Sequence, residues 1–160
     1  MKKCKLKYQN LIQIFTIFSI MIFSVNCSDN QACICSNPLL DSATVVHCDY
    51  VVDGDTWRFH IGNEEISVRI LNIDCFEIHT GERLDGQADE AGISSDSALT
   101  IGKAAKKFMD SLITGKEIKI VRDYNESNQD VYNRLLRKCY YKNILVDSIL
   151  FARGYGLRYN

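Results

Sequence analysis

The sequence predicts an α+β domain in which a small closed β-barrel carries packed α-helices. β-rich runs bounded by turn residues occupy residues 44–73, and at residue 95 the apolar spacing changes to that of a helix. Two more β-rich runs and a short helix then follow. The order of three strands, helix, strand, loop, strand and helix is typical of a small barrel with helices packed on it.

The first three strands are predicted at residues 44–52, 56–61 and 66–73. Gly62-Asn63 separates the second run from the third and is a dipeptide typical of tight hairpin turns. We therefore expect a meander of three antiparallel strands.

A helix is predicted at residues 95–113, where apolar residues recur every three or four positions and lysines lie opposite them. Ser95 or Asp96 is expected to cap its start and Gly115 its end. Two strands, at residues 117–122 and 135–141, flank a polar loop, and a helix at 145–153 ends at Gly154. The segment between Glu77 and the first helix is predicted to be an acidic loop, with Glu82, Asp85, Asp89, Glu90 and Asp96.

Residues 1–26 have the charged-then-apolar order of an export signal. The apolar run at 11–25 is shorter than the roughly 20 residues that a membrane-spanning helix needs. Cys27 lies two residues after this run and resembles a lipidated cysteine, although Ser24 and Asn26 depart from the usual processing pattern. We expect a signal peptide at 1–26, a polar tether at 27–44 and one folded domain at 45–160. The protein is expected outside the cytoplasm, as a membrane-anchored lipoprotein, periplasmic or secreted; a signal anchor is the alternative.

The charge balance argues against a general basic surface for nucleic acid. The signal carries 4 of the 19 basic residues and none of the 20 acidic ones, so the remainder has a formal charge of 15 − 20 = −5. Any polynucleotide must therefore bind through a local cluster of arginines and lysines. We expect a monomer.

The cysteines beyond residue 27 suit an oxidising compartment and number five: Cys33, Cys35, Cys48, Cys75 and Cys139. An odd number leaves one thiol over or paired between chains. Our expectation is that Cys48 pairs with Cys33 or Cys35. A structural zinc site is disfavoured, because the Cys33-x-Cys35 spacing is wrong for one and no second pair completes it.

Acidic residues and an arginine lie at the ends of neighbouring predicted strands. Asp53 and Asp55 precede the second strand, Arg69 lies within the third, and Asp74 and Glu77 follow it. Carboxylates beside a guanidinium match a hard cation bound next to a phosphate, which indicates a metal-assisted phosphodiesterase. The alternative for Asp53 and Asp55 is a simple turn with Gly54.

Three segments resemble, in order, the signature segments of the staphylococcal nuclease-like (thermonuclease) family. They are Asp53-Gly54-Asp55-Thr56, the run from Arg69 through Asp74 to Glu77, and Asp130-Val131-Tyr132-Asn133-Arg134. The resemblance covers about residues 45–159. It implies a five-stranded OB-fold-type barrel with packed helices and a calcium-dependent endonuclease that cleaves DNA and RNA.

The resemblance also implies roles for individual residues. Asp55, Asp74 and the backbone carbonyl of Cys75 would bind calcium, with Asp53 close by. Calcium takes several oxygen ligands and leaves room for water and a phosphate oxygen, which agrees with this set.

Glu77 would be the general base that activates water, and Arg69 and Arg134 would bind the scissile phosphate. Tyr132 is a candidate substrate contact. Surface ion pairs are the alternative for the arginines, since Arg137 and Lys138 next to Arg134 could form a solvated face.

Departures from the family pattern keep other functions open. Cys75-Phe76 stands where the family usually has Thr-Pro, and Asn133 stands where it has glycine. The acidic segment after Glu77 is longer and could repel polynucleotide or cover the site. A catalytically inactive OB-type nucleic-acid-binding module and a scaffold lipoprotein are the alternatives.

Overall fold

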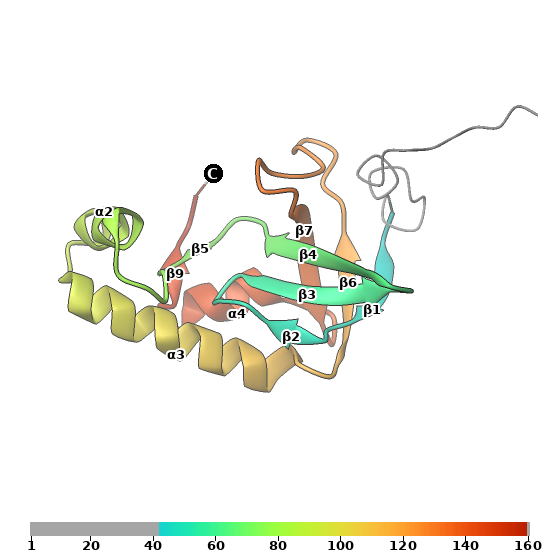
Figure 1. Ribbon diagram of the computed structural model, residues 1–160, viewed down its shortest axis with the longest axis horizontal. Coiled ribbons are helices and arrows are strands. Elements are labelled where there is room, and N and C mark those ends of the chain that lie inside the picture. The colour runs from blue at the N-terminus through green and yellow to red at the C-terminus, as the bar shows by residue number, and fades with distance from the viewer. Residues whose placement is uncertain (1–41, 160) are drawn as a thin grey trace, which may run out of the picture. The chain divides into compact units, whose positions relative to one another are not determined.

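The computed structural model describes residues 42–159, drawn in colour in Figure 1. The predicted signal peptide, most of the tether and Cys27 lie outside the described residues. Within residues 42–159, no helix has the length and apolarity needed to cross a membrane.

The predicted strand at 44–52 is present as two strands, β1 (Thr44–His47) and β2 (Tyr50–Val51). They are antiparallel to different neighbours, because β1 pairs with β6 (Glu117–Val121) and β2 with β3 (Thr56–Ile61). Between them the Cys48 N–H donates to Lys116 O and the Asp49 N–H to Arg58 O, both at 2.9 Å. The chain therefore changes partner at this point, and the bent segment closes the sheet.

The rest of the barrel follows in the order β3, β4 (Glu64–Ile70), β7 (Leu135–Tyr141) and β6. The β4–β7 pair is parallel, and the β3–β4 and β6–β7 pairs are antiparallel. Counting β1 and β2 as one bent strand, this is the predicted five-stranded OB-type barrel, and the predicted meander of β2, β3 and β4 is also confirmed (Figure 1).

The hairpin between β3 and β4 turns at Gly62-Asn63, as expected, with Gly62 in the left-handed region at φ 62°. Strand β4 ends at Ile70, earlier than the predicted residue 73, since Asn72 has φ 69° and bends the chain away. The chain then forms β5 (Asp74–Cys75), which pairs with β9 (Gly156–Leu157). A two-residue strand β8 (Ile144–Leu145) pairs with β7.

Helix α3 (Ser95–Ile113) has the predicted bounds and runs along the barrel (Figure 1). The cap prediction was wrong by one residue: the Ser94 hydroxyl accepts from the Ser97 N–H at 3.2 Å. The helix ends at Thr114, directly before Gly115 at φ 70°. Helix α4 (Val146–Ala152) lies within the predicted range.

The predicted acidic loop after Glu77 is wrong, because most of it is helix α2 (Glu82–Ala91). Leu84 and Ala88 are four residues apart and lie buried in one cluster with Phe76 and with Ala98 of α3. Packing of this small apolar face against α3 stabilises a helix that also carries exposed acidic residues.

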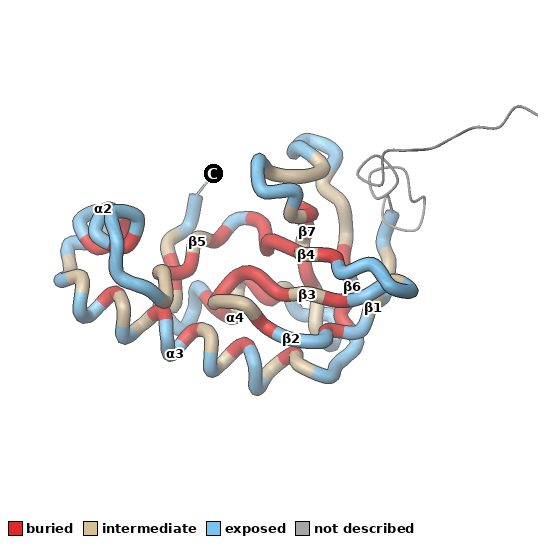
Figure 2. The backbone as a smooth tube through the Cα atoms, in the orientation of Figure 1, coloured by how far each residue is buried: buried red, intermediate tan, exposed pale blue. Residues whose placement is uncertain are grey.

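The core fills the barrel and the space between the barrel and α3 (Figure 2). Trp57 and Phe59 are its largest aromatic members, each at most 1% exposed. Cys48 and Cys139 are also buried as free thiols. Burial raises the pKa of each thiol to about 12. Cys48 is a free thiol in this structure, and its predicted partners, Cys33 and Cys35, lie outside the described residues.

Candidate active site

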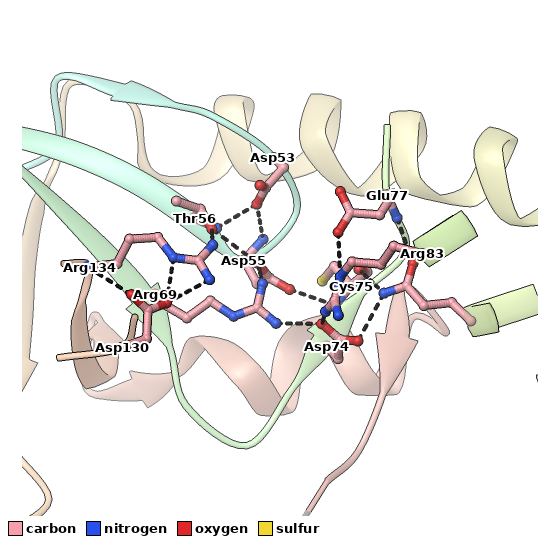
Figure 3. Close-up of polar contacts among 11 residues, drawn as sticks. Asp53, Asp55, Thr56, Arg69, Asp74, Cys75, Glu77, Arg83, Asp130 and Arg134 are labelled. Atoms are coloured by element: carbon pink, nitrogen blue, oxygen red, sulfur yellow. Dashed lines mark hydrogen bonds and ion pairs between the residues drawn. The ribbon is translucent and has the colours of Figure 1, made fainter. Parts of the chain in front are cut away.

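Arg69 of β4 joins two of the predicted site acids. Its guanidinium donates to Asp55 Oδ1 and to Asp74 Oδ1 (Figure 3). The register explains the first contact, since Arg69 lies opposite Thr56, the neighbour of Asp55. The second follows from the bend at Asn72, which returns the chain to the same end of the barrel.

The Asp55 carboxylate is 1% exposed, and its burial raises the pKa to about 8 against the opposing effect of Arg69. Asp74 behaves differently. Burial would raise the pKa of its carboxyl group, but a hydrogen bond from Gln87 and the charge of Arg69 hold that pKa below its usual range. Burial therefore disfavours the ionised form of Asp55 in spite of Arg69, and a cation nearby would favour that form.

The backbone of Cys75 lies between these acids. Its N–H donates to Asp55 Oδ2 at 2.6 Å, and its carbonyl oxygen accepts from Gln87 Nε2 at 2.9 Å. The same Nε2 donates to Asp74 Oδ2 at 2.9 Å. Arg69 donates to Asp55 and Asp74, and Gln87 donates to Asp74 and the Cys75 carbonyl. These two donors therefore link the three predicted calcium ligands in one network.

Glu77 joins this network through helix α2. Arg83 Nε donates to Glu77 Oε1 at 2.7 Å, and Arg83 Nη2 donates to Asp74 Oδ1 at 2.8 Å (Figure 3). The Glu77 N–H donates to Gln87 Oε1 at 2.9 Å. Arg83 and Gln87 were missed at the sequence level because their segment was predicted to be a loop. The four-residue spacing of Leu84 and Ala88 is the signal that indicates the helix.

Arg134 reaches the same end of the barrel from the loop before β7. Its Nη1 donates to Thr56 Oγ1 at 3.2 Å, while its Nε donates to Asp130 Oδ2 at 2.7 Å. Asp130 also accepts from the backbone N–H of Tyr132 and of Arg134. Asn133 has φ 60°, so this asparagine adopts the left-handed geometry that favours glycine.

Tyr132 is 76% exposed, and the Arg134 guanidinium lies over its ring at 5.3 Å from the centroid. Its position beside Arg134 agrees with a substrate contact.

Two neighbouring residues make contacts of a structural kind. The Asp53 carboxylate accepts from the N–H of Asp55 at 3.1 Å and of Thr56 at 2.7 Å, so its observed contacts are those of a turn. Arg137 is 0% exposed, so the alternative of a solvated face that it shares with Arg134 is wrong. Its guanidinium donates to the carbonyl oxygen of Asn128 at 3.1 Å and to Asn128 Oδ1 at 2.8 Å.

The family model described as "Staphylococcal nuclease homologue" matches residues 67–160, more than half of the chain. The chain belongs to the staphylococcal nuclease homologue family. Comparison with curated proteins finds no match. The matched range includes Arg69, Asp74, Glu77 and Arg134, and the fold brings Asp55, which lies outside that range, into contact with Arg69.

The donor set of this staphylococcal nuclease homologue agrees chemically with calcium. The part of the chain that the structure describes has no group of three or more His, Cys, Asp or Glu side chains arranged for a metal ion. The predicted set needs only two such side chains, since its third member is a carbonyl oxygen. Carboxylate and carbonyl oxygens are the ligands that calcium prefers, and a cation would favour the ionised form of the buried Asp55.

A pocket of about 280 Å³ opens beside these groups. Its lining includes Arg69, Asp74 and Arg83, together with Arg158 and Tyr159 near the C-terminus. Three guanidinium groups from separate parts of the chain thus border one pocket next to Asp74, an environment that suits a phosphate.

Proposed function

We propose that the protein is a calcium-dependent nuclease that hydrolyses phosphodiester bonds of DNA or RNA. One observation carries the proposal: a single guanidinium, that of Arg69, spans the carboxylates of Asp55 and Asp74, and Asp55 also accepts from the backbone of Cys75. Family membership supports the same class of function.

Asp55, Asp74 and the Cys75 carbonyl are the residues proposed to hold calcium. The ion would supply positive charge for an oxygen of the scissile phosphate and for the two carboxylates. Arg69, relieved of part of its pairing, and Arg134 would then donate to the other phosphate oxygens. Planar guanidinium donors stabilise the charge that grows as phosphorus becomes five-coordinate.

Glu77 is proposed to accept the proton of the attacking water. Its side chain is 34% exposed, so water can reach it, and its pairing with Arg83 keeps the carboxylate at the site. Attack in line with the 5′-oxygen would release that oxygen as the leaving group, so the products would end in a 3′-phosphate.

An assay of the purified mature protein on DNA and on RNA, with calcium or with excess chelator, tests this proposal. We expect cleavage that depends on calcium, with 3′-phosphate ends found by end-labelling. Equal cleavage in chelator would reject the calcium requirement, and 5′-phosphate ends would reject the proposed direction of attack.

A catalytically inactive OB-type binding module is the second candidate. Arg69 and Arg83 pair with Asp55, Asp74 and Glu77, and such internal ion pairs give the acids a structural use without a metal. Nucleic-acid binding without cleavage at any calcium concentration would favour this module.

We further propose that the protein acts outside the cytoplasm as a monomer, tethered through a lipid on Cys27. The lysines and the apolar run of residues 1–26 support export. A tether at 27–44 would leave the barrel clear of the membrane and open to polynucleotide.

A further inference from the structure

Helix α2 presents one face to residues 74–77, which carry most of the proposed site. Arg83 and Gln87 are four residues apart and therefore neighbours on this face. Leu84 and Ala88, next to them in sequence, are 1% exposed and pack in the cluster that contains Ala98 of α3. This packing fixes the rotation of α2, so the direction in which Gln87 points is fixed as well.

Gln87 is 5% exposed and uses both ends of its amide on residues 74–77. Its Nε2 donates to Asp74 Oδ2 and to the Cys75 carbonyl, each at 2.9 Å. Its Oε1 accepts from the Glu77 N–H, also at 2.9 Å. A buried amide is costly to leave without hydrogen bonds, so the helix and the segment hold each other in place.

We propose that Gln87 is a positioning residue, which sets the separation of two calcium-binding oxygens and fixes the backbone of the general base. The roles of Asp74, Cys75 and Glu77 in this statement rest on the proposed function. Each oxygen that accepts from Gln87 keeps a further lone pair, so the hydrogen bond and a cation are compatible. Groups behind metal ligands orient them in this way in other proteins.

Arg83 shares the face but not the role. Its side chain is 61% exposed, and its ion pairs with Asp74 and Glu77 are therefore open to solvent screening. Gln87 is buried and bonded at three points, so the constraint on the segment comes from Gln87.

Gln87→Met tests the proposal, because it keeps the length of the side chain and removes its donors and its acceptor. Without calcium, hydrogen exchange of the Glu77 amide should become at least tenfold faster than in the wild type. Calcium binding measured by titration calorimetry should weaken by about 10- to 100-fold, the usual effect of losing a partner behind a metal ligand. At saturating calcium, kcat should fall while KM for a DNA substrate changes little.

Asp89→Met is the matched control, since Asp89 is an exposed residue of the same helix. It should match the wild type in amide exchange, calcium affinity and kcat. Gln87→Asn keeps the amide on a shorter side chain and replaces the methionine variant if that variant does not fold; it should show the same losses to a smaller degree.

Unchanged Glu77 amide exchange together with unchanged calcium affinity in folded Gln87→Met or Gln87→Asn would overturn the proposal. If the wild type itself neither binds calcium nor cleaves nucleic acid, the proposed function fails. The exchange rate of the Glu77 amide then decides by itself whether Gln87 positions the segment.

Discussion

Gly102 of α3 lies against the backbone of Glu77 so closely that a Cβ at position 102 would overlap the carbonyl oxygen of Glu77. A Cβ at Gly54 would likewise overlap the Cys75 side chain, and a Cβ at Gly156 would overlap the Asp74 carbonyl oxygen. Glycines on three sides therefore let the acid-bearing segment sit at the meeting point of the barrel, α3 and β9.

Gly102→Ala should displace this segment, because the atoms that a Cβ meets are backbone carbonyls, which cannot rotate away. We expect a loss of about 1–3 kcal/mol in the free energy of unfolding, the scale of overpacking. Turnover should fall by roughly 100-fold, since small misplacements of reacting groups are costly. Gly86→Ala is the control: nothing lies within 4 Å of that position. It should stabilise α2 by about 0.5–1 kcal/mol and leave turnover unchanged.

Arg134→Ala should lower turnover by roughly two to three orders of magnitude, the scale for one lost transition-state contact. Its side chain is 25% exposed, so circular dichroism should show a retained fold. Glu77→Gln should have a similar effect on turnover. Lys103→Ala, an exposed change on α3, should leave turnover as it is. Full activity in Arg134→Ala would show that another residue binds the phosphate.

Arg137→Ala should act on stability instead. The buried guanidinium holds two oxygens of Asn128 and also the Leu136 carbonyl, and removing it leaves these acceptors without those partners. We expect the free energy of unfolding in urea to fall by about 3 kcal/mol. Arg137→Lys should restore only part of this loss, because an ammonium group cannot reproduce the planar fork. A stability equal to that of the wild type would contradict the structural role.

The pH dependence of stability should reveal the contacts of Asp130. Burial would raise the pKa of this carboxyl group, but hydrogen bonds from the N–H and guanidinium of Arg134 outweigh it and hold the pKa below its usual range. A lowered pKa stabilises the folded state above the unfolded-state value of about 3.9, and the contribution is lost as pH falls through the lower folded value. The stability difference between wild type and Asp130→Asn should thus be constant from pH 5 to 7 and shrink below about pH 4. A difference that persists unchanged at pH 2 would argue against this ion pair.

Cys27→Ser should test the proposed lipid anchor. If Cys27 carries a lipid, the wild type should partition into the detergent phase, and the variant should lose this partitioning and appear as an uncleaved or released form. Equal partitioning of both, with a soluble mature N-terminus beyond residue 27, would indicate ordinary secretion. That outcome would leave the nuclease proposal unchanged.

Local sequence patterns determined several elements of the fold. The bounds of α3, β3 and β7 follow from helical spacing or from β-rich runs, because each element's residues report its own periodicity. The turn at Gly62-Asn63 was determined in the same way. The identities of the acids and arginines at the strand ends also came from the sequence, through the order of three short motifs.

Contacts between elements decided the rest. The break at Cys48 reflects a change of hydrogen-bonding partner between two strands, and α2 exists because Leu84 and Ala88 meet α3. The change of partner leaves no local pattern, and α2 leaves only the four-residue spacing of Leu84 and Ala88. Arg137 looks like a surface residue by type, yet the loop that carries Asn128 folds over it.

The same distinction applies to the candidate site. The sequence determined which groups are present, but the tertiary structure decided that Arg69 joins Asp55 to Asp74 and that Gln87 holds both Asp74 and Glu77. The physical reason is that a hydrogen bond needs its donor and acceptor atoms within about 3 Å of each other. Their partners are set by how strands and helices pack, which no single segment encodes.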